Sequence, residues 1–173
     1  MKFEPRKPLH LPQDQYVGCR LYFVTICCEK RRKIFANPSN AITLLDDLKS
    51  VSQKNNFLLH AYCVMPDHVH ILVEGQSINC NLRTYLTELK QKTGYSLREA
   101  GQGDLWQKQY YDHILRKAED SDSIVWYIWM NPVRQGLVNK PEDHAFSGSC
   151  TVAWPPNRVK PDEWLPPWKK ASP

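Results

Sequence analysis

The sequence FLLHAYCVMPDHVHILVE, residues 57–74, decides the fold of this chain. Residues 57–65 and 68–74 are both rich in the apolar, β-branched and aromatic residues that favour strands. Only Pro66 and Asp67 separate the two segments, which leaves room for nothing but a tight turn or a bulge. These residues therefore predict two neighbouring strands of an antiparallel sheet.

Outward from this pair, hydrophobic patterns predict two further strands and three helices. The expected elements are a strand at Cys19–Cys28, a helix at about Ala41–Lys54, a helix at about Asn81–Ala100, a strand at Leu105–Arg116, and a helix that starts near Ser121 and ends by Asn131, because Pro132 follows. The order strand-helix-strand-strand-helix-strand-helix indicates the α+β class. We expect an antiparallel sheet with helices packed on one face, of ferredoxin-like type.

Length and composition indicate one compact, soluble unit, because the chain has 173 residues and is 42% hydrophobic. We expect a basic N-terminal arm at residues 1–17, one domain at 18–150 and a proline-rich tail at 151–173. There is no run of about 18 apolar residues, and the N-terminus lacks the apolar core of a secretory signal. These features predict a cytoplasmic protein with no membrane span. The formal net charge of +5 weakly favours anionic partners.

His68 and His70 lie two residues apart on a predicted strand, so their side chains share one face of the sheet. Two neighbouring imidazoles on a rigid strand form half of a metal site. The same pattern also arises by chance, as two histidines on an exposed surface. A further element, elsewhere in the chain, has to decide between these interpretations.

That element is the helical segment WYIWMNP, residues 126–132. Tyr127 and Asn131 are four residues apart and therefore lie on one helical face. An Asn oxygen is a neutral, hard ligand, suited to completing a two-histidine site for magnesium or manganese, with the phenol beside the metal. The alternative is a buried aromatic helix, and core packing is the better interpretation for Trp126 and Trp129.

Taken together, the motifs of the chain resemble those of the REP-associated tyrosine transposases. These are relatives of the insertion-sequence transposases with a single tyrosine, in the His-hydrophobic-His (HUH) nuclease superfamily. The matching stretches are VMPDHVHILV at 64–73, LWQ at 105–107, DHILR at 112–116 and YIWMNPVRQG at 127–136. By motif order and spacing, the resemblance covers roughly residues 15–150.

This resemblance implies an HUH nuclease fold and roles for four residues. His68, His70 and Asn131 would bind a divalent metal, Mg or Mn, and Tyr127 would be the nucleophile. The implied products are a 5′-phosphotyrosine and a free 3′-hydroxyl. The implied partner is single-stranded DNA folded into a hairpin with a short flanking tetranucleotide. Related enzymes include both monomers and homodimers.

Four other residues are weaker candidates for the site. Tyr110 and Tyr111 are rival nucleophiles, but neither has a ligand one helical turn away. His60 and His113 fit structural roles, although His113 lies in a stretch that resembles the family and could contact DNA or brace the site.

Basic residues are the candidates for DNA contact, with a solvated charged surface as the alternative for about half of them. The candidates are Arg6, Lys7, Lys30, Arg31, Arg32, Lys33, Arg116, Lys117 and Arg134.

The principal hypothesis is a metal-dependent transposase that nicks and rejoins single-stranded DNA at hairpin-forming repeats. A replication or conjugation nickase is disfavoured by the pairing of Tyr127 with Asn131 and by the lack of a helicase or second domain. A non-catalytic or domesticated hairpin DNA-binding protein is the alternative from another class. Such a protein need not retain His68, His70, Tyr127 and Asn131 together.

Overall fold

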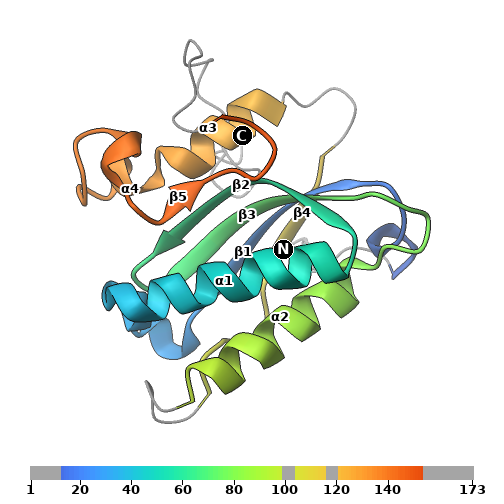
Figure 1. Ribbon diagram of the computed structural model, residues 1–173, viewed down its shortest axis with the longest axis horizontal. Helices are drawn as coiled ribbons and strands as arrows, with labels where there is room; N and C mark the ends of the chain where they lie inside the picture. The colour runs from blue at the N-terminus through green and yellow to red at the C-terminus, as the bar shows by residue number, and fades with distance from the viewer. Residues whose placement is uncertain (1–12, 99–103, 116–120, 154–173) are drawn as a thin grey trace, which may run out of the picture.

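A five-stranded antiparallel sheet forms the centre of the computed structural model, which describes residues 13–98, 104–115 and 121–153 (Figure 1). The strands lie in the order β4-β1-β3-β2-β5. Their bounds are β1 Leu21–Cys27, β2 Phe57–Met65, β3 His68–Gly75, β4 Tyr111–Ile114 and β5 Ser147–Gly148. The antiparallel sheet expected from the sequence is confirmed.

The hairpin of β2 and β3 occupies the middle of this sheet. Met65 pairs with His68, so Pro66 and Asp67 form a two-residue turn, as the sequence predicts. The end of β1 supports the turn, because the Cys28 N–H donates to the Asp67 carbonyl oxygen at 2.9 Å. His68, the first residue of β3, therefore directly follows a turn whose backbone is held by β1.

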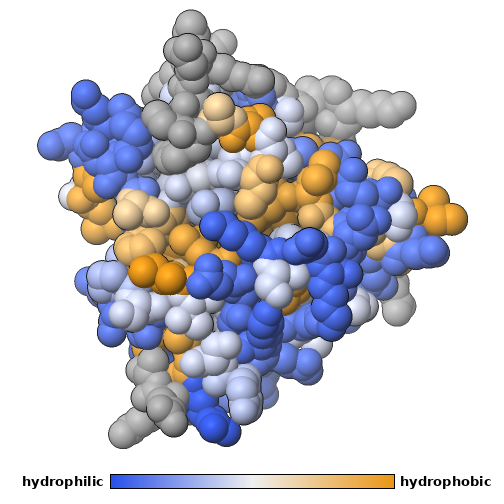
Figure 2. Space-filling model, viewed as in Figure 1, coloured by the Kyte–Doolittle hydropathy of each residue, from blue (hydrophilic) through white to orange (hydrophobic). Residues whose placement is uncertain are grey.

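Helices α1 (Pro38–Lys54) and α2 (Leu82–Ser96) cover one face of the sheet (Figure 1). Each begins at an asparagine, Asn37 or Asn81, whose side-chain oxygen accepts N–H bonds from the first turn. Their apolar stripes are buried with β1, β2 and β3 in the main core. Hydrophilic side chains cover much of their outward surface (Figure 2). The α+β class is confirmed, but the expectation that the helices pack on one face holds only for α1 and α2, because the residues of β1 and β3 that point away from these two helices are also apolar and bind a third helix.

Helix α3 (Ser121–Trp129) packs on the opposite face of the sheet. Ile124 and Ile128 from this helix are fully buried against Phe23 of β1 and Leu72 of β3, in a second, smaller core. This face also carries the odd-numbered residues of β1 and the even-numbered residues of β3. The sheet therefore has a core on each side, and α3 lies over the histidine strand.

Pro132 determines where α3 ends. The sequence predicts a helix that ends by Asn131, and α3 ends at Trp129. A short helix, α4 (Asn131–Arg134), starts directly afterwards, with Pro132 in its first turn. A proline is tolerated there because the first N–H groups of a helix have no partner within it.

The segment expected as one strand at Leu105–Arg116 is regular only over β4. Its first part turns into the main core, where Trp106 makes a single bridge with Cys28 and its indole N–H donates to Thr93 Oγ1 at 2.8 Å. Alternating character cannot reveal such a departure, because it depends on the space between α2 and the sheet. Strand β5 has only two residues, too few to produce a periodic signal.

Other predicted boundaries shift by a few residues. Cys19 and Arg20 precede β1, and α2 ends at Ser96, while its expected end at Ala100 lies outside the described residues. The connections contain the 3-10 helices η1 Gln13–Tyr16, η2 Glu29–Arg31, η3 Ile34–Ala36 and η4 Pro141–Asp143.

Most of the predicted arm and tail, namely residues 1–12 and 154–173, also lies outside the described residues. Within the described ranges, no helix combines the length and the apolar character needed to cross a membrane.

The backbone of Gly75, at the end of β3, lies close to the backbone of Gly18, and this close approach can be tested. A Cβ added at Gly75 would lie 2.5 Å from the Gly18 carbonyl oxygen and 2.8 Å from Cys80 Cβ. We expect Gly75→Ala to lower the free energy of unfolding by about 1–3 kcal/mol, because backbone has to move. In urea denaturation, Gly94→Ala is the matched control. It meets nothing within 4 Å in α2 and should raise stability by about 0.5–1 kcal/mol. Equal stability of Gly75→Ala and wild type would refute the tight approach.

Candidate active site

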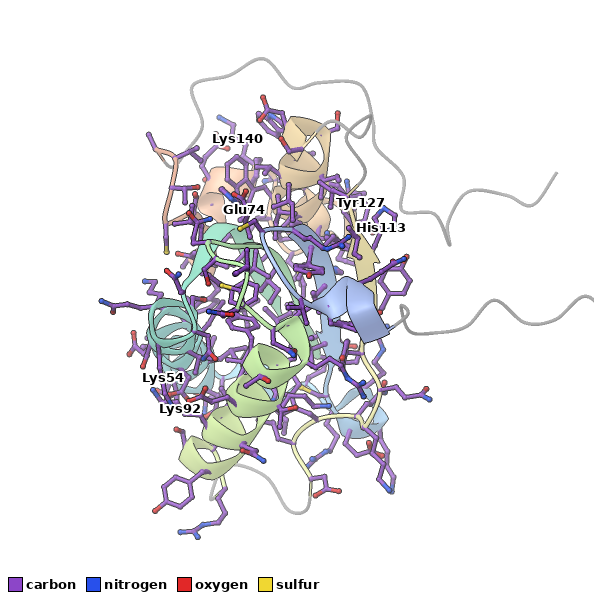
Figure 3. All side chains as sticks on the ribbon, turned by 90° about the vertical axis from the view of Figure 1, so that its right-hand side faces the viewer. Lys54, Glu74, Lys92, His113, Tyr127 and Lys140 are labelled. Atoms are coloured by element: carbon purple, nitrogen blue, oxygen red, sulfur yellow. The ribbon has the colours of Figure 1, made fainter. Side chains whose placement is uncertain are left out.

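The register of the sheet brings the functional candidates onto the α3 face. His70 pairs with Thr25, and Thr25 pairs with Tyr111 across β1. Phe23, which lies two residues before Thr25 on β1, pairs with His113 of β4. Directly paired residues point to the same side of a sheet. Three strands thus contribute polar and aromatic side chains to the surface beneath α3, where Tyr127 and His113 lie near each other (Figure 3).

The two histidines of β3 face each other through their Nε2 atoms, 3.1 Å apart. The other nitrogen of each ring, Nδ1, makes a hydrogen bond to a neighbouring side chain. His68 Nδ1 lies 2.5 Å from Asp67 Oδ1, and His70 Nδ1 lies 2.7 Å from Thr25 Oγ1. When each Nδ1 carries the proton and donates it to these oxygens, both Nε2 lone pairs point into the same space. This is how metal-binding histidines are usually oriented. The residues present therefore fit a divalent metal.

His70 is also held by aromatic packing. It is 5% exposed, and its ring stacks on Phe23 at a centroid distance of 5.6 Å and an interplanar angle of 22°. Sequence analysis did not identify Phe23 or Thr25 as part of this site. The signal that could have found them is the strand register, which sequence periodicity alone does not provide.

Tyr127 lies against the histidine pair from the side of α3. Its ring meets His70 at a centroid distance of 6.1 Å and Phe23 at 5.9 Å, both edge to face. Burial raises the pKa of Tyr127, and the nearby Arg134 guanidinium, 4.3 Å from the ring centroid, acts in the opposite direction. The tyrosine predicted as nucleophile and the predicted metal ligand His70 are thus neighbours within one chain.

Asn131 is buried at the junction of α3 and α4, with 5% of its surface exposed. Its side-chain nitrogen donates to the carbonyl oxygens of Tyr127 at 2.8 Å and Ile128 at 3.3 Å. These bonds fix the orientation of the amide through its nitrogen. The role of Asn131 as the third metal ligand stays a prediction.

The described residues contain no cluster of three or more His, Cys, Asp or Glu side chains placed to hold a metal ion. A site built on His68 and His70 therefore has to take its remaining ligands from other groups. An amide oxygen and the oxygens of a bound phosphate are ligands that magnesium and manganese accept.

The weaker candidates divide between the two faces. Tyr111 lies at this site, with its ring centroid 6.5 Å from that of Phe23, whereas Tyr110 packs against the main core and Lys90. His113 shares the face of the site by register. His60 does not join the histidine pair. Its Nε2 lies 2.8 Å from Oε2 of Glu74, which is four residues beyond His70 on β3.

The basic cluster predicted for DNA contact surrounds one end of the site. Lys30 and Arg31 adopt left-handed backbone conformations, with φ values of 53° and 54°, in the turn after β1. Arg31 lies 3.4 Å from Asp67, which in turn holds His68. Lys30 and Lys33 are exposed beside them. These charges therefore lie close to the first histidine.

Of the other basic residues predicted to contact DNA, two interact with the protein itself and four lie outside the described residues. Arg32 is half-buried and donates to backbone carbonyl oxygens of Glu29 and Asp104. Arg134 lies over the Tyr127 ring and donates to the Tyr127 carbonyl oxygen. The remaining candidates, Arg6, Lys7, Arg116 and Lys117, lie outside the described residues.

Comparison with known proteins identifies a family and two relatives. The profile of the family described as "Transposase IS200 like" matches residues 17–131. A REP-associated tyrosine transposase of Escherichia coli K12 is 24% identical over 132 residues, covering 76% of this chain and 78% of that protein. An uncharacterized Haemophilus influenzae protein is 26% identical over 159 residues, covering 74% and 88%.

A solved structure supports the fold. The structure described as a REP-associated tyrosine transposase bound to a REP hairpin aligns with a TM-score of 0.66 at 22% identity, covering 85% of this chain and 82% of that chain. The resemblance drawn from the sequence motifs, and the fold that it implies, are confirmed.

Proposed function

The chain belongs to the IS200-like transposase family, and from this premise we propose that it nicks and rejoins single-stranded DNA through Tyr127. The observation that carries the proposal is the ring contact between Tyr127 and His70, beside two imidazole nitrogens 3.1 Å apart. A nucleophile next to a cation site is an arrangement that favours phosphodiester transfer, because the cation can neutralise charge on the phosphate that the nucleophile attacks.

His68 and His70 would hold a magnesium or manganese ion, with the side-chain oxygen of Asn131 as the third protein ligand. Such an ion, when bound, neutralises negative charge that develops on the phosphate. Asp67 and Thr25 would accept hydrogen bonds from the two Nδ1 atoms, which leaves the Nε2 lone pairs for the ion and fixes the orientation of both rings. The hydrogen bonds of Asn131 to the end of α3 would couple the position of its oxygen to that of Tyr127.

In the proposed reaction, the Tyr127 oxygen attacks the scissile phosphorus in line and loses its proton. The bond from phosphorus to the 3′-oxygen breaks, and that oxygen takes up a proton to become a free 3′-hydroxyl. The protein keeps the 5′-phosphate as a phosphotyrosine. Attack by a 3′-hydroxyl reverses these changes, so rejoining needs no ATP. Arg134, over the Tyr127 ring, would also place a positive charge near the phosphate.

Hairpin-forming DNA is the proposed substrate. The support is the name of the Escherichia coli relative and the REP hairpin in the aligned structure. A non-catalytic hairpin-binding protein is the alternative function, and the packing of Tyr127 against His70 favours catalysis over it.

A covalent-adduct assay tests the proposal. We expect the full chain, mixed with a 5′-flanked hairpin oligonucleotide labelled on its 3′ side and with Mn²⁺, to give a labelled protein band that survives denaturation. Omitting the metal and adding a chelator should remove that band. Binding of the hairpin without any adduct, with metal present, would favour the non-catalytic alternative.

The exposed basic residues beside the histidine pair predict a salt effect. We expect the double variant Lys30→Gln, Lys33→Gln to bind the hairpin more weakly. The slope of log K against log salt should become shallower by about 0.7 for each single-strand phosphate that the variant no longer neutralises. Lys54→Gln is the matched control, since Lys54 is exposed beside α2, away from Tyr127 (Figure 3). A slope unchanged from wild type in the double variant would exclude Lys30 and Lys33 from the DNA interface.

A further inference from the structure

A cavity of about 400 Å³ lies beside the candidate active site, on the same face of the sheet. Trp126 and Trp129 of α3 form one wall, and Leu72 of β3 lies in the floor. Its polar side chains are His60 and Glu74 from the sheet and Ser121 and Asp122 from α3, and residues 151–153, after β5, line one side. Its volume is in the range that binds small organic groups.

The cavity and the candidate active site are built on the same strand, β3, and the same helix, α3. Glu74 lies four residues beyond His70 on β3, on the same face and about 13 Å away at the usual rise of a strand. Trp126 is the neighbour of Tyr127 on α3 and meets Trp129 edge to face at 6.0 Å. Glu74 and Tyr127 both lie toward the α3 side of the sheet (Figure 3). An unpaired strand with a phosphate at Tyr127 would reach the cavity within a few nucleotides.

Within the cavity, the Glu74 carboxylate accepts a hydrogen bond from His60. Glu74 Oε2 lies 2.8 Å from His60 Nε2, and His60 Nδ1 lies 3.0 Å from Thr151 Oγ1. This chain of bonds fixes the Glu74 carboxylate while its side chain stays 39% exposed, so Oε1 can still accept from a ligand. A carboxylate repels phosphate but accepts from N–H groups.

We propose that this cavity binds one unpaired base of the DNA flank, stacked on Trp126 and read by Glu74. This inference rests on the proposed function. An aromatic wall beside a fixed acceptor is how proteins hold bases outside a duplex. Guanine suits the cavity best, because its Watson–Crick edge presents two adjacent N–H donors to a carboxylate, whereas thymine presents one.

Hairpin oligonucleotides that carry a single abasic nucleotide at successive flank positions test this proposal. For wild type, one position should weaken binding roughly tenfold, the loss expected for one stacked base. Trp126→Leu should bind the intact flank about as weakly and should not respond to the abasic nucleotide at that position. Tyr95→Ala, which removes an exposed aromatic ring from α2, should behave as wild type.

The variant Glu74→Gln tests the proposal even if Trp126→Leu does not fold. Glu74→Gln is nearly isosteric and replaces one acceptor oxygen by a donor, so the preference at the sensitive position should shift from guanine toward adenine. If wild type binds or cleaves DNA and no flank position depends on Trp126 or Glu74, the cavity does not bind a base, and the proposed function stands. If wild type neither binds nor cleaves hairpin DNA, both proposals fall.

Discussion

Replacing Tyr127 with Phe should abolish the covalent adduct with DNA, a loss on the order of a thousandfold or more. The variant removes only the phenolic oxygen, which is the atom proposed to attack phosphorus. The ring can keep its edge-to-face contacts with His70 and Phe23 and its position below Arg134. We therefore expect normal thermal stability and near-normal hairpin affinity. Denaturing gels of the labelled DNA measure the adduct, and a filter-binding titration measures the affinity.

Tyr111→Phe is the matched control for this experiment. Tyr111 is a second tyrosine on the α3 face, with its ring centroid 6.5 Å from that of Phe23. Its variant should retain the adduct. An adduct that persists in Tyr127→Phe and disappears in Tyr111→Phe would transfer the nucleophile to β4 and refute the role given to α3.

Replacing His70 with Ala should lower adduct formation on the order of a hundredfold or more, because one of the two proposed imidazole ligands is removed. The loss should be accompanied by weaker Mn²⁺ binding, measured by titration calorimetry in the presence of hairpin DNA. Since His70 is buried and stacks on Phe23, thermal denaturation has to show that the variant is folded at the assay temperature.

His144→Gln provides the matched histidine control. His144 is half-buried and its ring contacts the Val64 carbonyl oxygen at 2.9 Å, an interaction that glutamine can preserve as a donor. This variant should bind Mn²⁺ and form the adduct as wild type does. Unchanged manganese affinity in His70→Ala would show that the metal, if required, binds elsewhere.

Local patterns were sufficient for the hairpin that carries the histidines. Alternation, β-branched residues and the Pro66-Asp67 turn predict both strands, and the structure places the same residues opposite each other. The proximity of Tyr127 and Asn131 also follows from their spacing of four residues, since the Asn131 side-chain nitrogen donates to the Tyr127 carbonyl oxygen at 2.8 Å. These features depend on neighbours in sequence, where backbone geometry fixes the period.

Residues remote in sequence could not be assigned in this way. Phe23 and Thr25 orient His70 because β1 pairs with β3 in one register, and a shift of one residue would point both side chains into the other core. The cavity between Trp126 and Glu74 likewise exists only because α3 packs on the face opposite α1 and α2.

The amino-acid sequence by itself determined the histidine strand, the tyrosine helix and the family to which they belong. Only the tertiary structure decided that Tyr127 lies against His70, with centroids 6.1 Å apart, and that Arg134 covers the tyrosine ring. The physical reason is that backbone periodicity sets which side a residue faces, whereas the packing of a helix on a sheet sets what it meets. That packing depends on side-chain volumes and strand register across the whole domain.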